Sequence, residues 1–440
     1  MRKTRWTALA AVGAATALAL SACASGGNGG SSSGEVVDLS AVDGEGKSIT
    51  VWVMNGDLGD ESVAAINQKF EAATGATVEV EMQQWDGITT KLTTALAGNT
   101  PPDVIDMGNT QVAGYAATGG LADLTAYKDQ LTQGQTWLGG LVDPATLDGA
   151  LYAVPSFAGD RAVIYNKKMW AEAGVTEAPT SLDEFTAALD KIAAANTAAD
   201  FSPMYLPGQL WYGGMQFVWD AGGDIAMNED GTWKGTLSSP ESIKGLEAFR
   251  DFQNKYSTEA SRTVNTNSPD QDAILANGQT SAILSTASHL NKVIDQSADL
   301  TAEDLGTFPF PGATGESQPV MLGGSVWGVA QKSDNQELAL AWVQIAASPE
   351  IQLDYVFGVD KWIPNSEDGI EAAREAGLSE HAEGYFTAAL RSKATPAAAN
   401  WSVIEGDKTL EQFFQSIATG TDPATAAAEA DAHLESVLNG

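Results

Sequence analysis

The arrangement of apolar residues after residue 48 constrains the fold more than any other feature of this sequence. Strand-like and helix-like stretches alternate there, beginning with a strand: residues 49–54, 60–75, 76–82, 88–98 and 101–108. The first stretch, ITVWVM, is an apolar run suited to a buried strand, whereas ATVEVEM alternates as a half-buried strand does. Val63, Ile66 and Phe70 lie on one face of the helical stretch between them, and Gly75 follows its end. This alternation predicts parallel βαβ units and an α/β fold.

The loops that follow the predicted strands are the expected place for a ligand. In open parallel sheets the ligand crevice lies beyond the carboxyl ends of the strands. These loops cover residues 55–57, 84–86 and 108–110, and they carry Asp57 and Trp85 among their side chains. We therefore expect a binding site at this edge of the sheet.

The length and composition predict two lobes with an acidic surface. The chain has 440 residues, of which 43% are hydrophobic, and a chain of this size exceeds what one hydrophobic core usually serves. Its formal net charge of −34 repels phosphate backbones, which argues against nucleic-acid binding. We interpret the charge as a source of solubility outside the cell.

The N-terminus reads as an export signal followed by a lipid-attachment site. A cationic start precedes an uncharged apolar run at residues 6–20, which is too short for a comfortable membrane span. The sequence LSAC at its end resembles the bacterial lipobox and contains Cys23, the only cysteine of the chain. We predict a lipoprotein signal peptide over residues 1–22 and a lipid-anchored flexible linker over residues 23–46. An ordinary cleaved signal with a chance cysteine is the alternative.

The sequence offers little for catalysis. The three histidines lie far apart and there is one cysteine, so we expect neither a metal site nor a cofactor. The sequence contains no HExxH, no Walker A loop, no GxGxxG after a strand and no GxSxG. Glycoside hydrolysis by a pair of carboxylates is kept as an alternative, because acidic residues are abundant, although no spacing in the sequence points to such a pair.

Tryptophan is the residue type that points to a ligand. The chain has 12 tryptophans, and an aromatic face stacks well on the apolar C–H face of a sugar ring. Trp170 and Trp342 lie in helical patterns and are expected in the core, while Trp137 and Trp233 stay undecided. The tryptophans near predicted strand ends or glycine-rich turns fit a core and a binding wall equally well: Trp85, Trp211, Trp219, Trp362 and Trp401.

From about residue 49 to its C-terminus, the chain resembles the extracellular solute-binding proteins of the sugar-binding, maltose-binding-protein-like family that serve ABC transporters. The resemblance rests on the order of several blocks: TPPDVIDMGNTQVAGYAATGGLADL, GALYAVPSFAGDRAVIYNKKMWAEAGV, PTSLDEFTAALDKI and LGGSVWGVAQKSDNQELALAWVQIAASPEIQ. It implies a two-lobe periplasmic-binding-protein-like fold with a hinge and an interlobe ligand cleft. Residues 47–155 and 283–325 are expected to form the N-terminal lobe, and residues 156–282 and 326–440 the C-terminal lobe.

The resemblance also implies polar ligand contacts. Asn55 and Asp57 match the sugar-facing loop of the maltose-binding relatives, but Leu58 replaces the lysine that follows there, which argues against maltose itself. Further contacts are implied in the loop after the third strand, at the first crossover and at two glycines that admit close backbone approach: Asn109, Gln111, Asp160, Arg161, Gly323 and Gly324. For Arg161 an interlobe ion pair is the alternative.

The aromatic contacts implied by the resemblance lie in the second lobe. Tyr212, with Trp211 beside it, and Trp401 fall at stacking aromatics of the family, and we expect them to form a wall opposite Asp57 and Asn109. Ser288 stands where a further block of the family has tryptophan. This implies either a differently shaped ligand or compensation from other side chains: His289, Trp219 or Trp362.

Together these features predict a non-catalytic, extracytoplasmic protein that captures a sugar or oligosaccharide and delivers it to the permease of an ABC importer. We expect a monomer without cofactor, metal or nucleic-acid partner, held at the outer face of the cell membrane by its N-terminal lipid alone. The alternatives are a binding protein for another small polar solute, such as a polyol or a glycerol phosphodiester, a secreted glycan hydrolase, and a surface adhesin for polymeric glycan.

Overall fold

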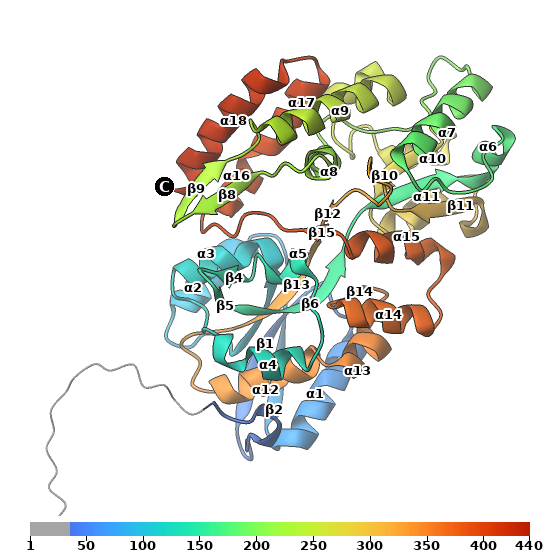
Figure 1. The fold of residues 1–440 in the computed structure, drawn as a ribbon. Helices are drawn as coiled ribbons and strands as arrows, with labels where there is room; N and C mark the ends of the chain where they lie inside the picture. The colour runs from blue at the N-terminus through green and yellow to red at the C-terminus, as the bar shows by residue number, and fades with distance from the viewer. Residues whose placement is uncertain (1–35) are drawn as a thin grey trace, which may run out of the picture. The chain divides into compact units, whose positions relative to one another are not determined.

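The computed structural model describes residues 36–440, so the predicted signal peptide, Cys23 and the first part of the predicted linker lie outside the described residues. The prediction of a flexible linker up to residue 46 is wrong for its last part, because Leu39 and Val42 are buried in an apolar core of the folded chain. Residues Val37–Gly440 form one compact unit, in which two α/β lobes lie one above the other (Figure 1). Within this part of the chain, no helix combines the length and the apolar character that crossing a membrane requires.

The lower lobe in Figure 1 is built on a six-stranded sheet with the strand order β14-β6-β13-β3-β1-β2. Its strands are β1 (Ser48–Met54), β2 (Thr77–Gln83), β3 (Val104–Gly108), β6 (Ala153–Gly159), β13 (Gly323–Val329) and β14 (Ile363–Pro364). β1 runs parallel to β2 and β3, whereas β13 is antiparallel to β3 and β6. The predicted parallel βαβ arrangement is therefore confirmed for β1 to β3, and the sheet as a whole is mixed.

Helix α1 (Asp60–Thr74) shows how the sequence pattern produces the first βαβ unit. Val63, Ile66 and Phe70 are buried against the sheet, as their helical spacing predicts. Gly75 ends the helix in the left-handed conformation, at φ 73°, and its N–H donates to the Glu71 carbonyl. The chain can therefore turn directly into β2.

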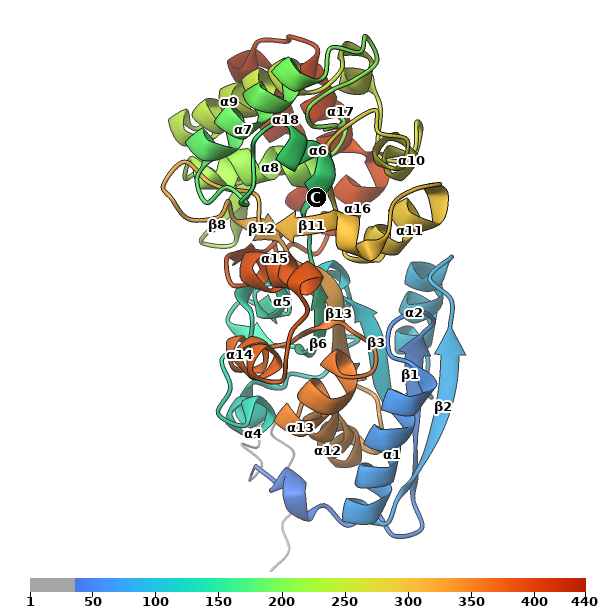
Figure 2. The same ribbon diagram turned by 90° about the vertical axis from the view of Figure 1, so that its right-hand side faces the viewer.

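Helices cover both faces of the six-stranded sheet. α1 and α12 pack with it in one apolar cluster, and α2 and α3 contribute to another (Figure 2). The remaining elements of this lobe are α2 (Ile88–Ala97), α3 (Val112–Ala117), α4 (Lys128–Thr132), α5 (Gly139–Val142), β4 (Thr146–Leu147), β5 (Ala150–Leu151), α12 (Gln336–Ala346) and α13 (Pro349–Ile351).

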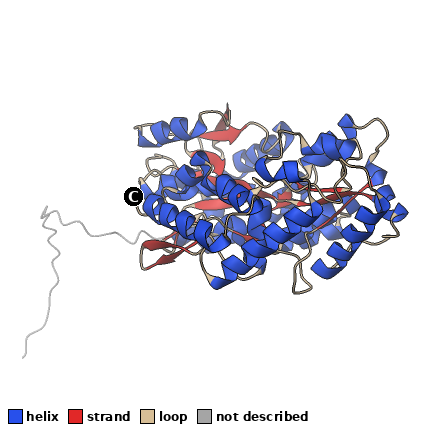
Figure 3. Cartoon of the chain, turned by 90° about the horizontal axis from the view of Figure 1, so that it is seen from above, coloured by secondary structure: helices blue, strands red, loops and turns tan. Residues whose placement is uncertain are grey.

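The upper lobe contains a three-stranded sheet in which β7 (Ala162–Asn166) is the central strand, antiparallel to both β10 (Ala282–Ser285) and β11 (Leu305–Phe308). Helices lie around this sheet, and a small hairpin of two strands lies at the edge of the lobe (Figure 3). These elements are α6 (Lys167–Glu172), α7 (Leu182–Ala195), α8 (Trp211–Asp220), β8 (Ala226–Glu229), β9 (Thr232–Gly235), α9 (Pro240–Tyr256), α10 (Gln271–Ala276), α11 (Ser288–Gln296), α16 (Trp401–Asp407), α17 (Thr409–Ala418) and α18 (Pro423–Leu438).

Further elements lie where the two lobes meet. The short strands β12 (Val320–Met321) and β15 (Ser392–Lys393) pair with each other. α14 (Glu367–Glu375) packs on β14 of the lower lobe, whereas α15 (Glu380–Ala389) packs mainly on β11 of the upper lobe. The chain first passes from one sheet to the other between β6 and β7.

The predicted lobe boundaries are wrong in two segments. β10 pairs with β7 along its whole length, so residues 283–308 belong to the upper lobe rather than to the N-terminal one. β13 pairs with β3 and β6, α12 packs against α1, and β14 pairs with β6, so residues 326–364 belong to the lower lobe. β10 and β13 are short apolar runs that could pair in either sheet. Only their long-range partners determine to which sheet each strand belongs.

Two of the tryptophans expected in the core are there. Trp170 is 1% exposed and Trp342 is 0% exposed, and each indole Nε1 donates to a polar side chain, Ser281 and Asn67 respectively. Of the two undecided tryptophans, Trp137 is buried and Trp233 is half-buried against the core of the upper lobe.

Candidate functional site

A cavity of about 400 Å³ lies where the two lobes face each other. The lower lobe lines it with the loops that follow β1 and β2, with β6 and β13, and with the segment leading into β14. The upper lobe and α15 supply the opposite side. Its wall includes Asp57, Trp85, Phe157, Asp160, Arg161, Tyr212, Thr286, Ser288, Gly323, Gly324, Ser325, Lys361, Trp362, Tyr385 and Phe386.

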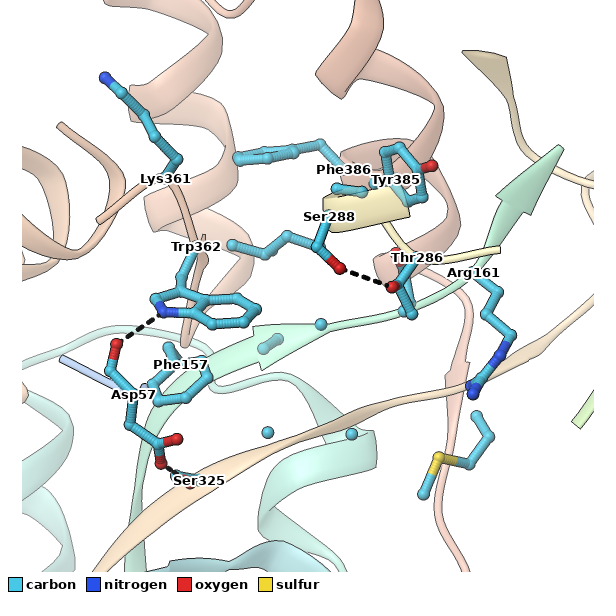
Figure 4. A pocket seen from close by; sticks show the side chains of 18 of the residues that line it. Asp57, Phe157, Arg161, Thr286, Ser288, Ser325, Lys361, Trp362, Tyr385 and Phe386 are labelled. Atoms are coloured by element: carbon cyan, nitrogen blue, oxygen red, sulfur yellow. Dashed lines mark hydrogen bonds between the residues drawn. The ribbon is translucent and has the colours of Figure 1, made fainter. Parts of the chain in front are cut away.

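An aromatic pair forms the apolar surface of this cavity. The rings of Phe157 and Trp362 stack with centroids 4.6 Å apart and an interplanar angle of 26°. The indole Nε1 of Trp362 donates to the Asp57 carbonyl at 2.9 Å, which fixes the ring beside the loop after β1 (Figure 4). A hydrogen-bonded aromatic plane with one face toward a cavity is suited to the apolar face of a sugar ring.

Gly324 allows β13 to lie close to the backbone of Phe157. Its φ is 143°, and a Cβ at this position would lie 2.1 Å from the Phe157 carbonyl oxygen. Only glycine fits such a backbone position without a shift. The predicted importance of Gly324 for close approach therefore has a steric basis, although the approach that it permits is to Phe157.

Asp57 supplies a carboxyl group at one side of the cavity. The Ser325 hydroxyl donates to its Oδ2, and burial raises the pKa of Asp57 to about 6. Asp106 lies close by, 1% exposed, where its Oδ2 accepts from the Met54 N–H at 3.0 Å. Burial, with the neighbouring Asp57 charge, raises the pKa of Asp106 well above its usual range. One of these two carboxyl groups can thus stay protonated while the other ionises.

Arg161 lies on the opposite side of the cavity from Asp57 (Figure 4). Its guanidinium covers the ring of Tyr212 at 3.8 Å from the centroid, and Tyr212 stacks in turn on Trp211 at 4.0 Å. Among the ion pairs of residues 36–440, none includes Arg161, so the alternative of an interlobe ion pair is not realised. The stacked guanidinium can therefore offer N–H donors to a ligand.

Asp160 adjoins this arginine at the crossover between β6 and β7. It is 2% exposed, and its carboxyl oxygens have no hydrogen-bond partner among the described residues. Burial raises the pKa of Asp160 well above its usual range, and the Arg161 charge opposes this shift. Burial of both oxygens therefore favours the protonated form of this carboxyl group.

The structure brings many of the residues predicted from the sequence to the cavity wall: Asp57, Trp85, Asp160, Arg161, Tyr212, Gly323, Gly324 and Trp362. Trp85 is 41% exposed beside the cavity, so part of its ring is open to solvent. These residues come from both lobes, as a ligand held between lobes requires.

The remaining polar candidates lie outside this cavity. Asn55 is exposed and donates to the Gln84 side chain at 3.3 Å. Asn109 is buried, its side-chain Nδ2 donates to the carbonyls of Gly140 and Leu322, and the residue is not part of the cavity wall. Gln111 lines a separate, smaller cavity of about 170 Å³ beside α3.

His289 and three tryptophan candidates also lie away from the cavity wall. The Nδ1 atom of His289 is 2.6 Å from Asp272 Oδ2. Trp211 and Trp219 are buried in the upper core, where the Trp219 indole donates to Asp224. Trp401 is 0% exposed. The expected wall of Trp211, Tyr212 and Trp401 is therefore wrong except for Tyr212, and the aromatic pair of the lower lobe takes its place.

Sequence reasoning missed several residues of the cavity wall: Phe157, Thr286, Ser288, Ser325, Lys361, Tyr385 and Phe386. Of these residues, only Ser288 stands out in the sequence, and it does so as the residue that replaces a tryptophan of the family, not as a predicted contact. Phe157 and Ser325 sit within apolar strands, and Tyr385 and Phe386 sit within a helix. Nothing local in the sequence marks such residues as facing a cavity.

Comparisons with known proteins agree with this architecture. The family model described as bacterial extracellular solute-binding protein matches residues 55–353. The diacetylchitobiose binding protein DasA of Streptomyces coelicolor is 35% identical over 405 residues, which cover 89% of this chain and 90% of that protein.

Solved structures with the same fold include the sugar-binding protein MalE from Xanthomonas citri, with a TM-score of 0.76 at 20% identity, covering 89% of this chain and 97% of that one. The GacH receptor of Streptomyces glaucescens, solved unliganded and with acarbose, has a TM-score of 0.68 at 21% identity, covering 89% of this chain and 98% of that one. These proteins share the two-lobe fold, so the predicted fold class is confirmed.

Proposed function

Because the chain belongs to the family of bacterial extracellular solute-binding proteins, we propose that it binds a sugar or short oligosaccharide in the cavity between its lobes and delivers it to an ABC importer. The observation that carries this proposal is the stacked pair of Phe157 and Trp362, bordered by Asp57 and Ser325 on one side and faced by Arg161 from the other. An apolar plane with a polar surround matches the two characters of a pyranose ring.

The size of the cavity supports a small ligand. About 400 Å³ lies within the range of roughly 300–1,000 Å³ that small-molecule sites occupy. Contacts from both lobes would favour the closed form when ligand is present, and the first crossover between β6 and β7 lies next to Asp160 and Arg161.

The relative from Streptomyces coelicolor suggests which sugar to test first. Its name states that it binds diacetylchitobiose, and it is 35% identical to this chain. We infer that a disaccharide of N-acetylated amino sugars is the first candidate here. Arg161 supports this choice, since a stacked guanidinium can donate to the carbonyl oxygen of an acetamido group.

The remaining parts of the proposal concern location and partners. We propose that Cys23, which lies outside the described residues, carries the lipid that holds the protein at the outer face of the membrane. The protein would act as a monomer and hand its ligand, chemically unchanged, to the permease. Among residues 36–440, no three metal-binding side chains come together.

A thermal-shift screen against mono- and oligosaccharides tests the proposal, because a ligand that binds only the folded state raises the melting temperature. We expect diacetylchitobiose to raise it, and chromatography after prolonged incubation to recover the disaccharide intact. Shorter sugars in that incubation would indicate a hydrolase. If no saccharide changes the melting temperature but a polyol or a glycerol phosphodiester does, the proposed ligand class is wrong.

A further inference from the structure

One wall of the cavity has a buried support that makes no contact with the cavity itself. We propose that Gln271, Asp272 and His289 are positioning residues, which hold the cavity-facing segment 286–288 in the orientation that ligand binding needs. This inference rests on the proposed function, because it concerns the same cavity.

The segment 286–288 has little backbone support of its own. It joins β10 to α11, and the pairing of β10 with β7 ends at Ser285. Beyond that point the backbone is held by local bonds, from the His289 N–H to the Thr286 carbonyl at 3.0 Å and from Leu290 to Ala287 at 3.1 Å. Such turns fix the shape of the segment, while its direction relative to the cavity depends on the packing of α11 against α10 and on side-chain bonds.

This segment brings two hydroxyl groups to the cavity wall. The side chains of Thr286 and Ser288 lie 3.2 Å apart, oxygen to oxygen, and both line the cavity that Trp362 also lines (Figure 4). They belong to the upper lobe, whereas Trp362 belongs to the lower one. A small rotation of the segment would therefore change the width of the cavity between hydroxyl groups and aromatic plane.

Two consecutive residues at the start of α10 hold the segment at both ends. On one side, the Gln271 amide Nε2 donates to the Ser285 hydroxyl at 3.0 Å and to the Leu284 carbonyl at 3.4 Å. On the other side, His289 Nδ1 lies 2.6 Å from Asp272 Oδ2. Because a carboxylate oxygen only accepts, Nδ1 carries the proton and donates it.

The burial of these groups points to a role in geometry. Gln271 is 1% exposed and Asp272 is 2% exposed, whereas the His289 side chain is 23% exposed. A buried carboxylate is costly to desolvate, so such pairs add little net stability, but they hold their partners in one arrangement. Here the arrangement that is held is the entry and exit of a cavity-lining segment.

The chain contains a matched pair for comparison. His433 Nε2 lies 2.8 Å from Asp407 Oδ2, with side chains 45% and 34% exposed. Neither residue lines the cavity. The same substitution at His433 therefore removes a histidine–aspartate pair without touching the segment 286–288.

The test compares His289→Ala, His289→Asn and His433→Ala by two readouts. Hydrogen exchange of residues 286–290 in the ligand-free protein is expected to speed up by about tenfold in His289→Ala, because local opening costs less without the anchor. The dissociation constant for diacetylchitobiose, measured by calorimetry, is expected to rise by about fivefold or more. His289→Asn keeps an N–H donor at the position of Nδ1 and should recover most of both changes, while His433→Ala should change neither.

Unchanged exchange in folded His289→Ala overturns the positioning role, as does an equal change in His433→Ala. Failure of the asparagine variant to recover either readout also overturns it. Because exchange is measured without ligand, it decides the positioning role even if the parent protein binds no saccharide. Failure of this inference and failure of the proposed function are thus distinguishable.

Discussion

Replacement of Trp362 by alanine is the sharpest perturbation of the proposed binding surface. The change removes the ring that stacks on Phe157 at 4.6 Å and the indole donor that bonds the Asp57 carbonyl at 2.9 Å. Asp57 would keep its bond from Ser325 but lose the contact that fixes its loop against the aromatic plane. Both the apolar and the polar side of the cavity are therefore affected by one substitution.

The size of the effect follows from these contacts. An aromatic pair contributes about 0.5–1.5 kcal/mol beyond its burial, and a hydrogen bond of this kind about 0.5–1.5 kcal/mol. Loss of a central aromatic anchor costs about 2 kcal/mol or more of binding free energy, which corresponds to a roughly thirtyfold larger dissociation constant. Trp362→Phe keeps a ring over Phe157 and loses only the indole donor, so we expect a loss of less than about tenfold.

Isothermal titration calorimetry with the saccharide found by thermal shift measures these differences. Circular dichroism of each variant checks that it is folded. If folded Trp362→Ala binds as tightly as the parent protein, the Phe157–Trp362 surface is not the ligand platform. If the alanine and phenylalanine variants are equally impaired, the indole donor and not the stack is the dominant contact.

Three further predictions concern stability, the core and the anchor. Because burial raises the pKa of Asp57 to about 6, above an unfolded value near 3.9, its contribution to stability falls as the pH rises from about 4 to 6. Asp57→Asn should therefore raise the free energy of unfolding by about 2 kcal/mol at pH 7.5, and by little at pH 4, in urea titrations; an equal gain at both pH values would contradict this. Trp401→Ala should lower the free energy of unfolding by about 3–5 kcal/mol, because the ring is 0% exposed. A folded variant with unchanged stability that no longer binds sugar would show instead that Trp401 contacts the ligand. Cys23→Ala should release the protein from the membrane fraction of the cells, and retention at the same mass would refute the lipid anchor.

The local pattern of the sequence was sufficient for the first βαβ units but not for the lobe boundaries. β1, α1 and β2 each carry their own signature in apolar spacing, and the structure confirms them. β10 and β13 carry no such signature, since each is a short buried strand that fits either sheet. Their partners, β7 for one and β3 and β6 for the other, lie far away in the sequence. Long-range pairing of this kind leaves no mark on the local pattern.

The tryptophans show that the local sequence pattern also does not distinguish cavity-lining residues from core residues. Trp362 and Trp401 both lie near turns in the sequence, and both were equally consistent with core and ligand wall. In the structure Trp362 lines the cavity, while Trp401 opens α16 and is enclosed in the upper core. The difference depends on which helices pack around each residue, and composition and spacing do not contain that information. Asp160 and Arg161, by contrast, were located through the block that contains the crossover, because the lobes must meet there.

A crystal structure of the protein with diacetylchitobiose tests the central claim most directly. We expect density for a sugar ring over the indole of Trp362, with a sugar hydroxyl within hydrogen-bond distance of the Asp57 carboxyl group and an acetamido oxygen near Arg161. Density for the disaccharide at another place, with the cavity between β6, β13 and the segment 286–288 empty of sugar, would contradict the account.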